Sequence, residues 1–230
     1  MSLFAIGDTH LSFGSDKPMD IFRGWDDYVR RLEENWRAVV APGDTVVIPG
    51  DISWAMTLEN ALEDFRFLHS LPGRKIIMKG NHDYWWGTMR KMETFLEENG
   101  LTTIKILHNN AYRAGDFAIA GTRGWFFDAE SDADGKILAR EIGRLNASVE
   151  KARELGGELL VFLHYPPATE TQVCRGLYDA VTRSGARRCY YGHLHSFIPP
   201  GSASFSSGDT KFALVSSDFL KFCPKLIEKF

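Results

Sequence analysis

Five short polar motifs are spread along this chain, and each follows an apolar run that predicts a β-strand. They are Asp8-Thr9-His10, Gly50-Asp51, Gly80-Asn81-His82-Asp83, Leu163-His164 and Gly192-His193-Leu194-His195. In open α/β sheets, ligands bind beyond the carboxyl ends of the strands. Loops of this kind would therefore bring carboxylates, an amide and imidazoles to one place. This arrangement constrains the fold more than any other feature of the sequence.

Strand-like runs alternate with segments of helical periodicity over the first 100 residues, which indicates βαβ units with parallel strands. Strands are expected at residues 3–6, 45–48, 75–78, 103–107, 117–120, 159–163, 188–191 and 211–215. Apolar faces at helical spacing begin at Trp25, Leu58, Trp85, Leu138 and Val173. The helix-poor stretches around 103–121 and after 205 are expected to add antiparallel strands. We see no repeat, linker or boundary, so residues 1–230 are predicted to form a single α/β domain.

Composition excludes several classes of protein. The chain has 230 residues, of which 44% are hydrophobic and 25% charged, as in globular domains with a sizeable core. The net charge of −3 argues against general nucleic-acid binding. No stretch approaches the roughly 18 apolar residues of a membrane span, and no basic region of a signal peptide is seen. Three cysteines without a CxxC motif are typical of reduced thiols. We expect a cytoplasmic protein without a membrane partner.

Each polar motif, taken alone, has an ordinary structural interpretation. An aspartate after a strand commonly forms a turn or caps a helix. Asn81 after a glycine suits a turn, and His164 could be a buried histidine bonded to the backbone. The alternating His193 and His195 need something that bridges their rings. Because carboxylates and imidazoles recur after so many strands, the whole set indicates a two-metal hydrolytic centre.

The ordered set Asp-x-His, Gly-Asp, Gly-Asn-His-Asp, His and Gly-His-x-His, from residue 8 to residue 195, resembles the motifs of the calcineurin-like metallophosphoesterases. The resemblance implies two facing mixed β-sheets flanked by helices, a four-layer α/β/β/α sandwich, with two bound metal ions. The ligands it implies are Asp8, His10 and His195 for the first metal, Asn81, His164 and His193 for the second, and Asp51 as the bridging carboxylate. Manganese suits such mixed ligation, with iron or zinc as alternatives.

The resemblance also implies hydrolysis of phosphate monoesters or diesters. Two cations lower the pKa of a bridging water, so that hydroxide can attack phosphorus in line. His82 would lie beside the metals without binding them, stabilise the phosphoryl oxygens and protonate the leaving group. Asp83 would orient the His82 ring and stabilise its charge. The substrate would be a phosphorylated small molecule or a phosphoprotein, and the family does not decide between them.

The chain departs from many family members directly after the Gly-Asp motif. Those members carry a second acidic residue a few positions after the motif, whereas Asp51 is followed here by Ile52-Ser53-Trp54-Ala55-Met56. The ligand itself is kept. The departure therefore concerns neighbouring and substrate contacts only.

Some polar and aromatic residues carry weaker signals. Arg123 follows an expected strand, and its guanidinium could bind a phosphate through two parallel hydrogen bonds. The alternative is a surface arginine in a Gly-rich turn. The aromatic residues near two of the motifs could stack on a substrate or anchor helices. They are Trp54, Tyr84, Trp85 and Trp86. The two histidines outside the metal pattern are His69 and His108.

Residues 130–141 have the spacing of a calcium loop, with acidic groups at positions 1, 3, 5 and 12 and Gly135 at position 6. Glu130, however, stands where an aspartate is expected, and no clear helix precedes it. We favour the alternative, in which these acidic residues begin the amphipathic helix that follows and interact with its dipole.

Two other functional classes remain as alternatives. A protein of this fold can bind partners without catalysis, but such proteins typically lack a ligand or the histidine of the third motif. Here both are present. A nuclease would normally need a basic groove, and 27 Lys and Arg against 30 Asp and Glu give no overall excess of positive charge.

Overall fold

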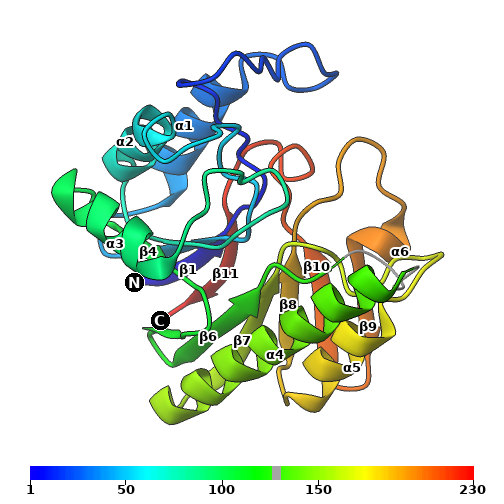
Figure 1. The fold of residues 1–230 in the computed structure, drawn as a ribbon. Coiled ribbons are helices and arrows are strands. Elements are labelled where there is room, and N and C mark those ends of the chain that lie inside the picture. The colour runs from blue at the N-terminus through cyan, green and yellow to red at the C-terminus, as the bar shows by residue number, and fades with distance from the viewer. Residues whose placement is uncertain (126–130) are drawn as a thin grey trace.

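The computed structural model describes residues 1–125 and 131–230, and its strands form two mixed sheets (Figure 1). The first sheet contains β1 (Ser2–Ala5), β2 (Thr45–Ile48), β3 (Arg74–Ile77), β4 (Ile104–Ile106) and β11 (Lys225–Lys229), in the order β11-β1-β2-β3-β4. The second contains β5 (Tyr112–Ala114), β6 (Phe117–Thr122), β7 (Glu158–Leu163), β8 (Arg188–Tyr191), β9 (Ser204–Ser207) and β10 (Thr210–Leu214), in the order β5-β6-β7-β8-β10-β9.

Helices cover the outer faces of both sheets. They are α1 (Tyr28–Val39), α2 (Leu62–Ser70), α3 (Met89–Glu98), α4 (Asp132–Leu155), α5 (Arg175–Arg183) and the short α6 (Pro200–Ala203). In Figure 1, α1, α2 and α3 lie with the first sheet, and α4 and α5 run along the second. The termini lie side by side, because the backbone N–H of Phe230 donates to the carbonyl of Met1 at 2.9 Å.

Three apolar layers hold the molecule together. Trp36 and Phe65 belong to the layer between the first sheet and its helices. Val47 and Phe162 belong to the layer where the two sheets face each other. Leu145 belongs to the layer between the second sheet and α4 and α5. The layers therefore follow the order α/β/β/α, which confirms the expected fold class.

The inner strands are buried on both faces. In β1, Phe4 packs on the helix side, whereas Leu3 and Ala5 face the second sheet. In β2, Val46 packs on the helix side and Val47 on the inter-sheet side. Since successive side chains of a strand point to opposite faces, such strands appear in the sequence as continuous apolar runs.

The eight expected strands are present, with ends that differ by at most two residues in the structure. Three further strands were not expected, namely β5, β9 and β11. They lie at sheet edges, where charged and small residues replace apolar runs. The expectation of antiparallel additions was partly wrong, because β4 pairs in parallel with β3, and β10 with β8. Among the described strands, the antiparallel pairs are β5 with β6, β9 with β10, and β11 with β1.

Four expected helices begin later than their apolar pattern, and one of them is α5, whose pattern begins at Val173. Trp25, Leu58 and Trp85 are buried, yet each lies in a turn before α1, α2 or α3. A buried residue ahead of a helix mimics helical periodicity. Within residues 1–125 and 131–230, no helix has the length and apolar character needed to cross a membrane.

Candidate metal centre

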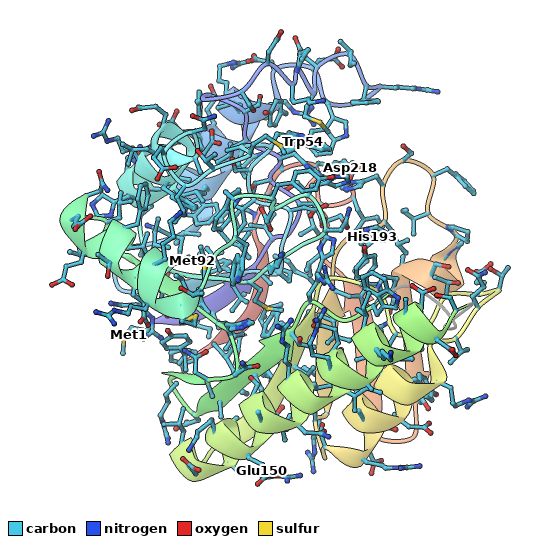
Figure 2. The ribbon with its side chains drawn as sticks, in the orientation of Figure 1. Met1, Trp54, Met92, Glu150, His193 and Asp218 are labelled. Atoms are coloured by element: carbon cyan, nitrogen blue, oxygen red, sulfur yellow. The ribbon has the colours of Figure 1, made fainter. Side chains whose placement is uncertain are left out.

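The polar motifs converge where the two sheets meet. Asp8, Asp51 and Asn81 follow β1, β2 and β3 of the first sheet, and His164 and His193 follow β7 and β8 of the second. Because the strands that precede them are parallel within each sheet, their carboxyl ends lie at one edge. Figure 2 shows His193 on this side of the molecule, together with Trp54 and Asp218.

The backbone at these positions is strained. Asp8, His10, Asp51 and His193 adopt φ values of 57°, 45°, 51° and 72°, in the left-handed region that non-glycine residues rarely enter. Such conformations cost about 1–3 kcal/mol each and are typical of functional sites. The surrounding loops therefore hold these four side chains in place against the local preference of the chain.

Glycines in two motifs allow the loops to approach closely. A Cβ atom at Gly80 would collide with the carboxylate of Asp51, and one at Gly192 would collide with the carboxylate of Asp8. The glycines therefore let the backbone pass directly beside the acidic side chains.

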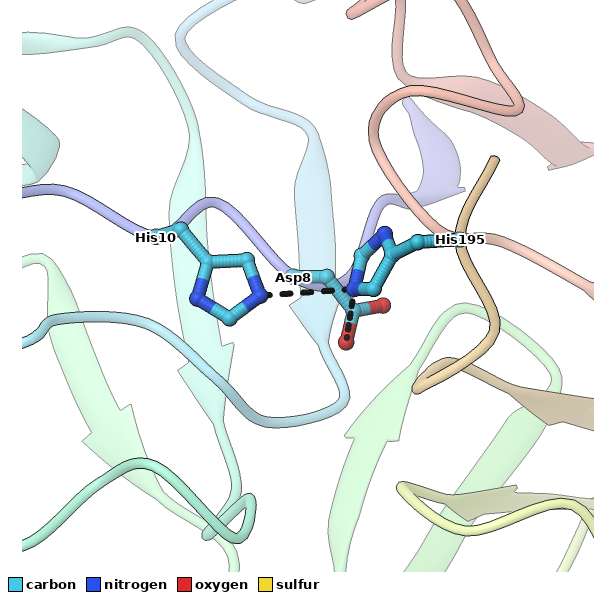
Figure 3. Close-up of side chains that lie close together, drawn as sticks. All are labelled: Asp8, His10 and His195. Atoms are coloured by element: carbon cyan, nitrogen blue, oxygen red, sulfur yellow. Dashed lines mark hydrogen bonds and ion pairs between the residues drawn. The ribbon is translucent and has the colours of Figure 1, made fainter. Parts of the chain in front are cut away.

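Asp8, His10 and His195 form the first ligand cluster, whose candidate ligand atoms all lie within 4.8 Å of one another (Figure 3). The Nε2 atoms of the two histidine rings are 3.3 Å apart. Nε2 of His195 also lies 3.7 Å from Oδ1 of Asp8. Three donor atoms from opposite ends of the sequence therefore converge on one point.

Asn81, His164 and His193 form the second ligand cluster. Oδ1 of Asn81 lies 2.6 Å from Nε2 of His164 and 2.9 Å from Nδ1 of His193. Asp51 lies between the clusters, with Oδ2 at 3.7 Å from Nε2 of His10 and 3.5 Å from Nε2 of His164. This position is suited to the bridging role that the resemblance implies.

The donor atoms fit metal ions. Oδ2 of Asp8 is buried and has no hydrogen-bond partner among residues 1–125 and 131–230. Nε2 of His10 faces Nε2 of His195. Because Asp218 holds the proton of the neutral His195 ring on Nδ1, Nε2 of His195 carries a lone pair and no N–H. A cation would satisfy such lone pairs together, since neutral imidazole and carboxylate are its usual ligands. The first cluster, Asp51 and the second cluster could therefore hold two ions.

Burial controls the protonation of these groups. It raises the pKa of Asp8 to about 6, an effect that His195 and His164 partly offset. It lowers the pKa values of His10 and His193 to about 3. Both rings are therefore neutral at pH 7, which is the form that binds a metal.

Sequence reasoning missed two groups that hold the ligand rings. Oδ1 of Asp218 bonds to Nδ1 of His195 at 2.9 Å, and the carbonyl of Pro49 bonds to Nδ1 of His164 at 3.1 Å. Each bond places the ring proton on Nδ1 and leaves Nε2 free for a metal. Asp218 follows a strand within four residues, which is the signal that could have found it.

His82 lies beside the clusters, as expected. Its ring centroid is 5.8 Å from that of His10 and 4.3 Å from that of Trp54. Its backbone N–H donates to Oδ1 of Asp51 at 2.8 Å. Burial lowers the pKa of the His82 ring, which remains partly exposed to solvent.

The predicted contact between Asp83 and the His82 ring was wrong. The buried Asp83 carboxylate accepts hydrogen bonds from the backbone N–H groups of Asp51, Ile52, Ser53 and Gly80 and from the indole of Trp85. It therefore ties the loop after β2 to the loop after β3. Asp83 supports the positions of His82 and Asp51 through the backbone.

Arg123 lies next to the second cluster, but its guanidinium faces α4. Nη2 is 3.7 Å from Oε1 of Glu141, and Cζ lies 4.9 Å from the ring centroid of Trp125. The carbonyl of Arg123 accepts the backbone N–H of His164 at 3.1 Å. Its predicted contact with substrate stays a prediction.

The aromatic residues divide between the two alternatives. Trp85 is 4% exposed and donates to Asp83, so it is a core residue. Trp54 stacks on His10 at 5.0 Å and donates to the sulfur of Met19, so both its face and its N–H are engaged. Tyr84 is exposed beside His82, at 6.1 Å between ring centroids.

The calcium interpretation of residues 130–141 is wrong for the part that the structure describes, and Glu130 lies outside that part. Ser131 caps α4 through its hydroxyl, which accepts the N–H of Asp134. From Asp132 onwards the segment is helical, so its carboxylates do not encircle an ion. The alternative of an acidic helix N-terminus is confirmed.

Comparison with known proteins gives one family and several solved structures of similar fold. The family described as calcineurin-like phosphoesterase matches residues 1–197. No curated protein matches the chain significantly.

Among 29 matching chains of solved structures, three illustrate the likeness. A protein of unknown function, AQ665 from Aquifex aeolicus, is 16% identical with a TM-score of 0.52, over 98% of this chain and 95% of its own. Phosphopantetheinyl hydrolase (PptH) from Mycobacterium tuberculosis is 14% identical with a TM-score of 0.55, over 100% and 96%. TT1561 of Thermus thermophilus is 10% identical with a TM-score of 0.57, over 97% and 96%. At these identities the likeness concerns the fold.

Proposed function

The chain belongs to the calcineurin-like phosphoesterase family, and we propose that it is a metal-dependent hydrolase of phosphate esters that works with two metal ions. The observation that carries this proposal is that Asp8, His10 and His195 converge on one point and Asp51, His164 and His193 on another, while Asp51 also lies 3.7 Å from His10. The ions would be divalent or trivalent, with manganese preferred over iron and zinc. In the bound state they would supply an activated water and Lewis acidity toward the phosphoryl oxygens.

His82 is the residue of this chain best placed to act on the substrate. Its side chain adjoins the first cluster through His10, and its buried Nδ1 atom has no hydrogen-bond partner in the part of the chain that the structure describes. The neutral ring can donate a hydrogen bond to a phosphoryl oxygen, and the negative charge of that group would raise the lowered pKa of the ring. With its pKa raised, the ring would take up a proton from solvent, and His82 as imidazolium would then donate that proton to the leaving oxygen and return to the neutral form.

The remaining residues of the proposed machinery fix geometry. Asp218 and the Pro49 carbonyl orient His195 and His164, and Asp83 joins the loops that carry Asp51 and His82. Such an arrangement needs little rearrangement when the phosphate binds. The choice between monoester and diester, the in-line attack by a bridging hydroxide and a cytoplasmic location stay predictions.

The test begins with protein stripped by a chelator and reloaded with Mn²⁺. Turnover of p-nitrophenyl phosphate and of bis(p-nitrophenyl) phosphate is measured side by side, together with the metal content per chain. We expect turnover that appears only with metal and saturates at two ions. The preferred compound then separates monoesterase from diesterase. Two bound ions without turnover of either compound would contradict hydrolysis of simple esters.

A further inference from the structure

A group of positive side chains flanks the second ligand cluster. We call Lys79, Arg123 and Arg144 the cationic flank. Lys79 lies two residues before Asn81 in the loop after β3. The carbonyl of Arg123 accepts the backbone N–H of His164 at 3.1 Å. Two residues of the flank are therefore held by the backbone next to ligands of the second cluster, and the third, Arg144 on α4, pairs with Glu141, which also lies 3.7 Å from Arg123.

The carboxylates near the flank are already engaged. Glu141 accepts from Nη1 of Arg144 at 2.6 Å, accepts the hydroxyl of Thr122 at 2.6 Å and lies 3.7 Å from Arg123. Asp83, which also attracts the Lys79 ammonium, accepts four backbone N–H groups. The three positive charges of the flank are therefore balanced by two carboxylates, Glu141 and Asp83, which also accept other hydrogen bonds.

Hydrogen-bond donors remain unused in the same region. Nε of Arg123 and Nε1 of Trp86 are both buried without a partner in the described structure. The Trp86 ring packs against His108, with centroids 6.1 Å apart. Burial lowers the pKa of His108, and the positive charges of Arg144 and Lys79 lower it further. His108 therefore lies within the influence of the flank, although the sequence placed it outside the metal pattern.

The flank is fixed in position and still open to solvent. Arg123 is stacked over Trp125 at 4.9 Å, and Arg144 is tied to Glu141. Their side chains are 15% and 30% exposed. Guanidinium groups held in this way are suited to phosphate, which they bind through parallel hydrogen bonds.

We propose that Lys79, Arg123 and Arg144 form an anion subsite, so that the substrate carries a second phosphate in addition to the one attacked at the metal centre. This inference rests on the phosphoesterase activity proposed above. The subsite lies on the side of the second cluster, and it selects bisphosphorylated small molecules over compounds with one phosphate. The net charge of −3 gives no overall excess of positive charge that would favour a nucleic acid.

The test compares inhibitors that differ by one phosphate. Ethanediol, butanediol and hexanediol bisphosphates are set against the matching alkyl monophosphates, so that three spacings are sampled. Each is titrated into Mn²⁺-loaded protein, with p-nitrophenyl phosphate turnover as the readout and calorimetric binding in parallel. We expect at least one bisphosphate to bind roughly 10- to 100-fold more tightly than its monophosphate, as one or two charge-assisted hydrogen bonds would give.

Substitution then locates the effect. Arg123→Gln and Arg144→Gln should each reduce the ratio of monophosphate to bisphosphate inhibition constants roughly tenfold. The matched control is Arg183→Gln on α5, where the side chain is 81% exposed and pairs with Asp179. It should leave the ratio unchanged. Because the readout is a ratio, a variant with less folded protein still reports on the subsite. If Arg123→Gln fails to fold, Arg144→Gln gives the answer.

The outcomes separate this inference from the activity on which it rests. Equal inhibition at every spacing, with turnover intact, overturns the subsite and leaves the phosphoesterase proposal standing. A bisphosphate preference that survives both substitutions also overturns it. If the protein shows no turnover, calorimetry alone compares the affinities for bisphosphates and monophosphates. Tighter binding of a bisphosphate that both substitutions abolish then supports the subsite, even though hydrolysis of simple esters has failed, and equal affinities overturn it.

Discussion

The first and second ligand clusters use similar side chains but are supported in different ways. In the first cluster, the His195 ring is held by the Asp218 carboxylate, and Trp54 stacks on His10. In the second, the His164 ring is held by the neutral Pro49 carbonyl. A carboxylate partner makes an imidazole a stronger ligand than a carbonyl does.

The charge of the ligands differs in the same direction. Apart from Asp51, which lies near both clusters and groups with His164 and His193, the first cluster contains the Asp8 carboxylate, whereas the second has the neutral Asn81 amide and lies beside the cationic flank. Burial alone would lower the pKa of His195, but the Asp218 bond and the Asp8 charge together outweigh it and raise this pKa to about 9 in the metal-free protein, so an ion at the first cluster has to displace a proton at pH 7. The comparison teaches that the two ions need not be equivalent: we expect the first cluster to bind its ion more tightly.

The largest effect is expected at Asp51, which lies between the clusters. Asp51→Asn should lower kcat by about 1,000-fold or more, because the loss of one shared carboxylate weakens the stabilisation by two cations. Metal content per chain should fall for both ions. A variant that keeps one ion at full affinity would show that Asp51 belongs to a single cluster.

His82→Ala should lower kcat by roughly 100- to 10,000-fold, since the proton donor is lost. Both ions should stay bound, because His82 belongs to neither cluster. The comparison variant is His82→Gln, which keeps a hydrogen-bond donor and should recover part of the rate. Unchanged kcat in His82→Ala would remove this residue from the mechanism, and loss of one ion would assign it to a cluster.

Asp83→Asn tests the support that both clusters share. The asparagine side chain would place an N–H donor where a carboxylate oxygen now accepts backbone N–H groups, and those donors would lose their partner. The free energy of unfolding should therefore fall by roughly 2–3 kcal/mol. Denaturant unfolding of the metal-free protein measures this change. Asp116→Asn is the control, because that side chain is 93% exposed. Equal stability of the two variants would contradict the role of Asp83 in joining the loops.

Asp218→Asn should weaken metal binding at the first cluster alone, by roughly 10- to 100-fold. A competitive metal titration measures the dissociation constants of the tightly and the weakly bound ion separately, and so shows which of them changes. Asp209→Asn in the exposed turn before β10 serves as control. If the weaker ion is the one affected, the proposed order of affinities is reversed.

Local sequence determined much of this protein. Continuous apolar runs identified the strands that are buried on both faces, because burial of both faces leaves no room for polar residues. The ordered motifs identified the family, and the glycines within them mark places where only a backbone without Cβ fits. Edge strands such as β5 and β9 were not predicted, because they contain exposed residues and therefore lack a continuous apolar run.

Tertiary structure alone decided which distant groups support the motifs. Asp218 reaches His195, Pro49 reaches His164, and α4 brings Arg144 to the cationic flank. Such contacts join segments far apart in the chain, so no local periodicity encodes them. The role of Asp83 changed for the same reason: its sequence neighbour is His82, but folding surrounds its carboxylate with the backbone of another loop.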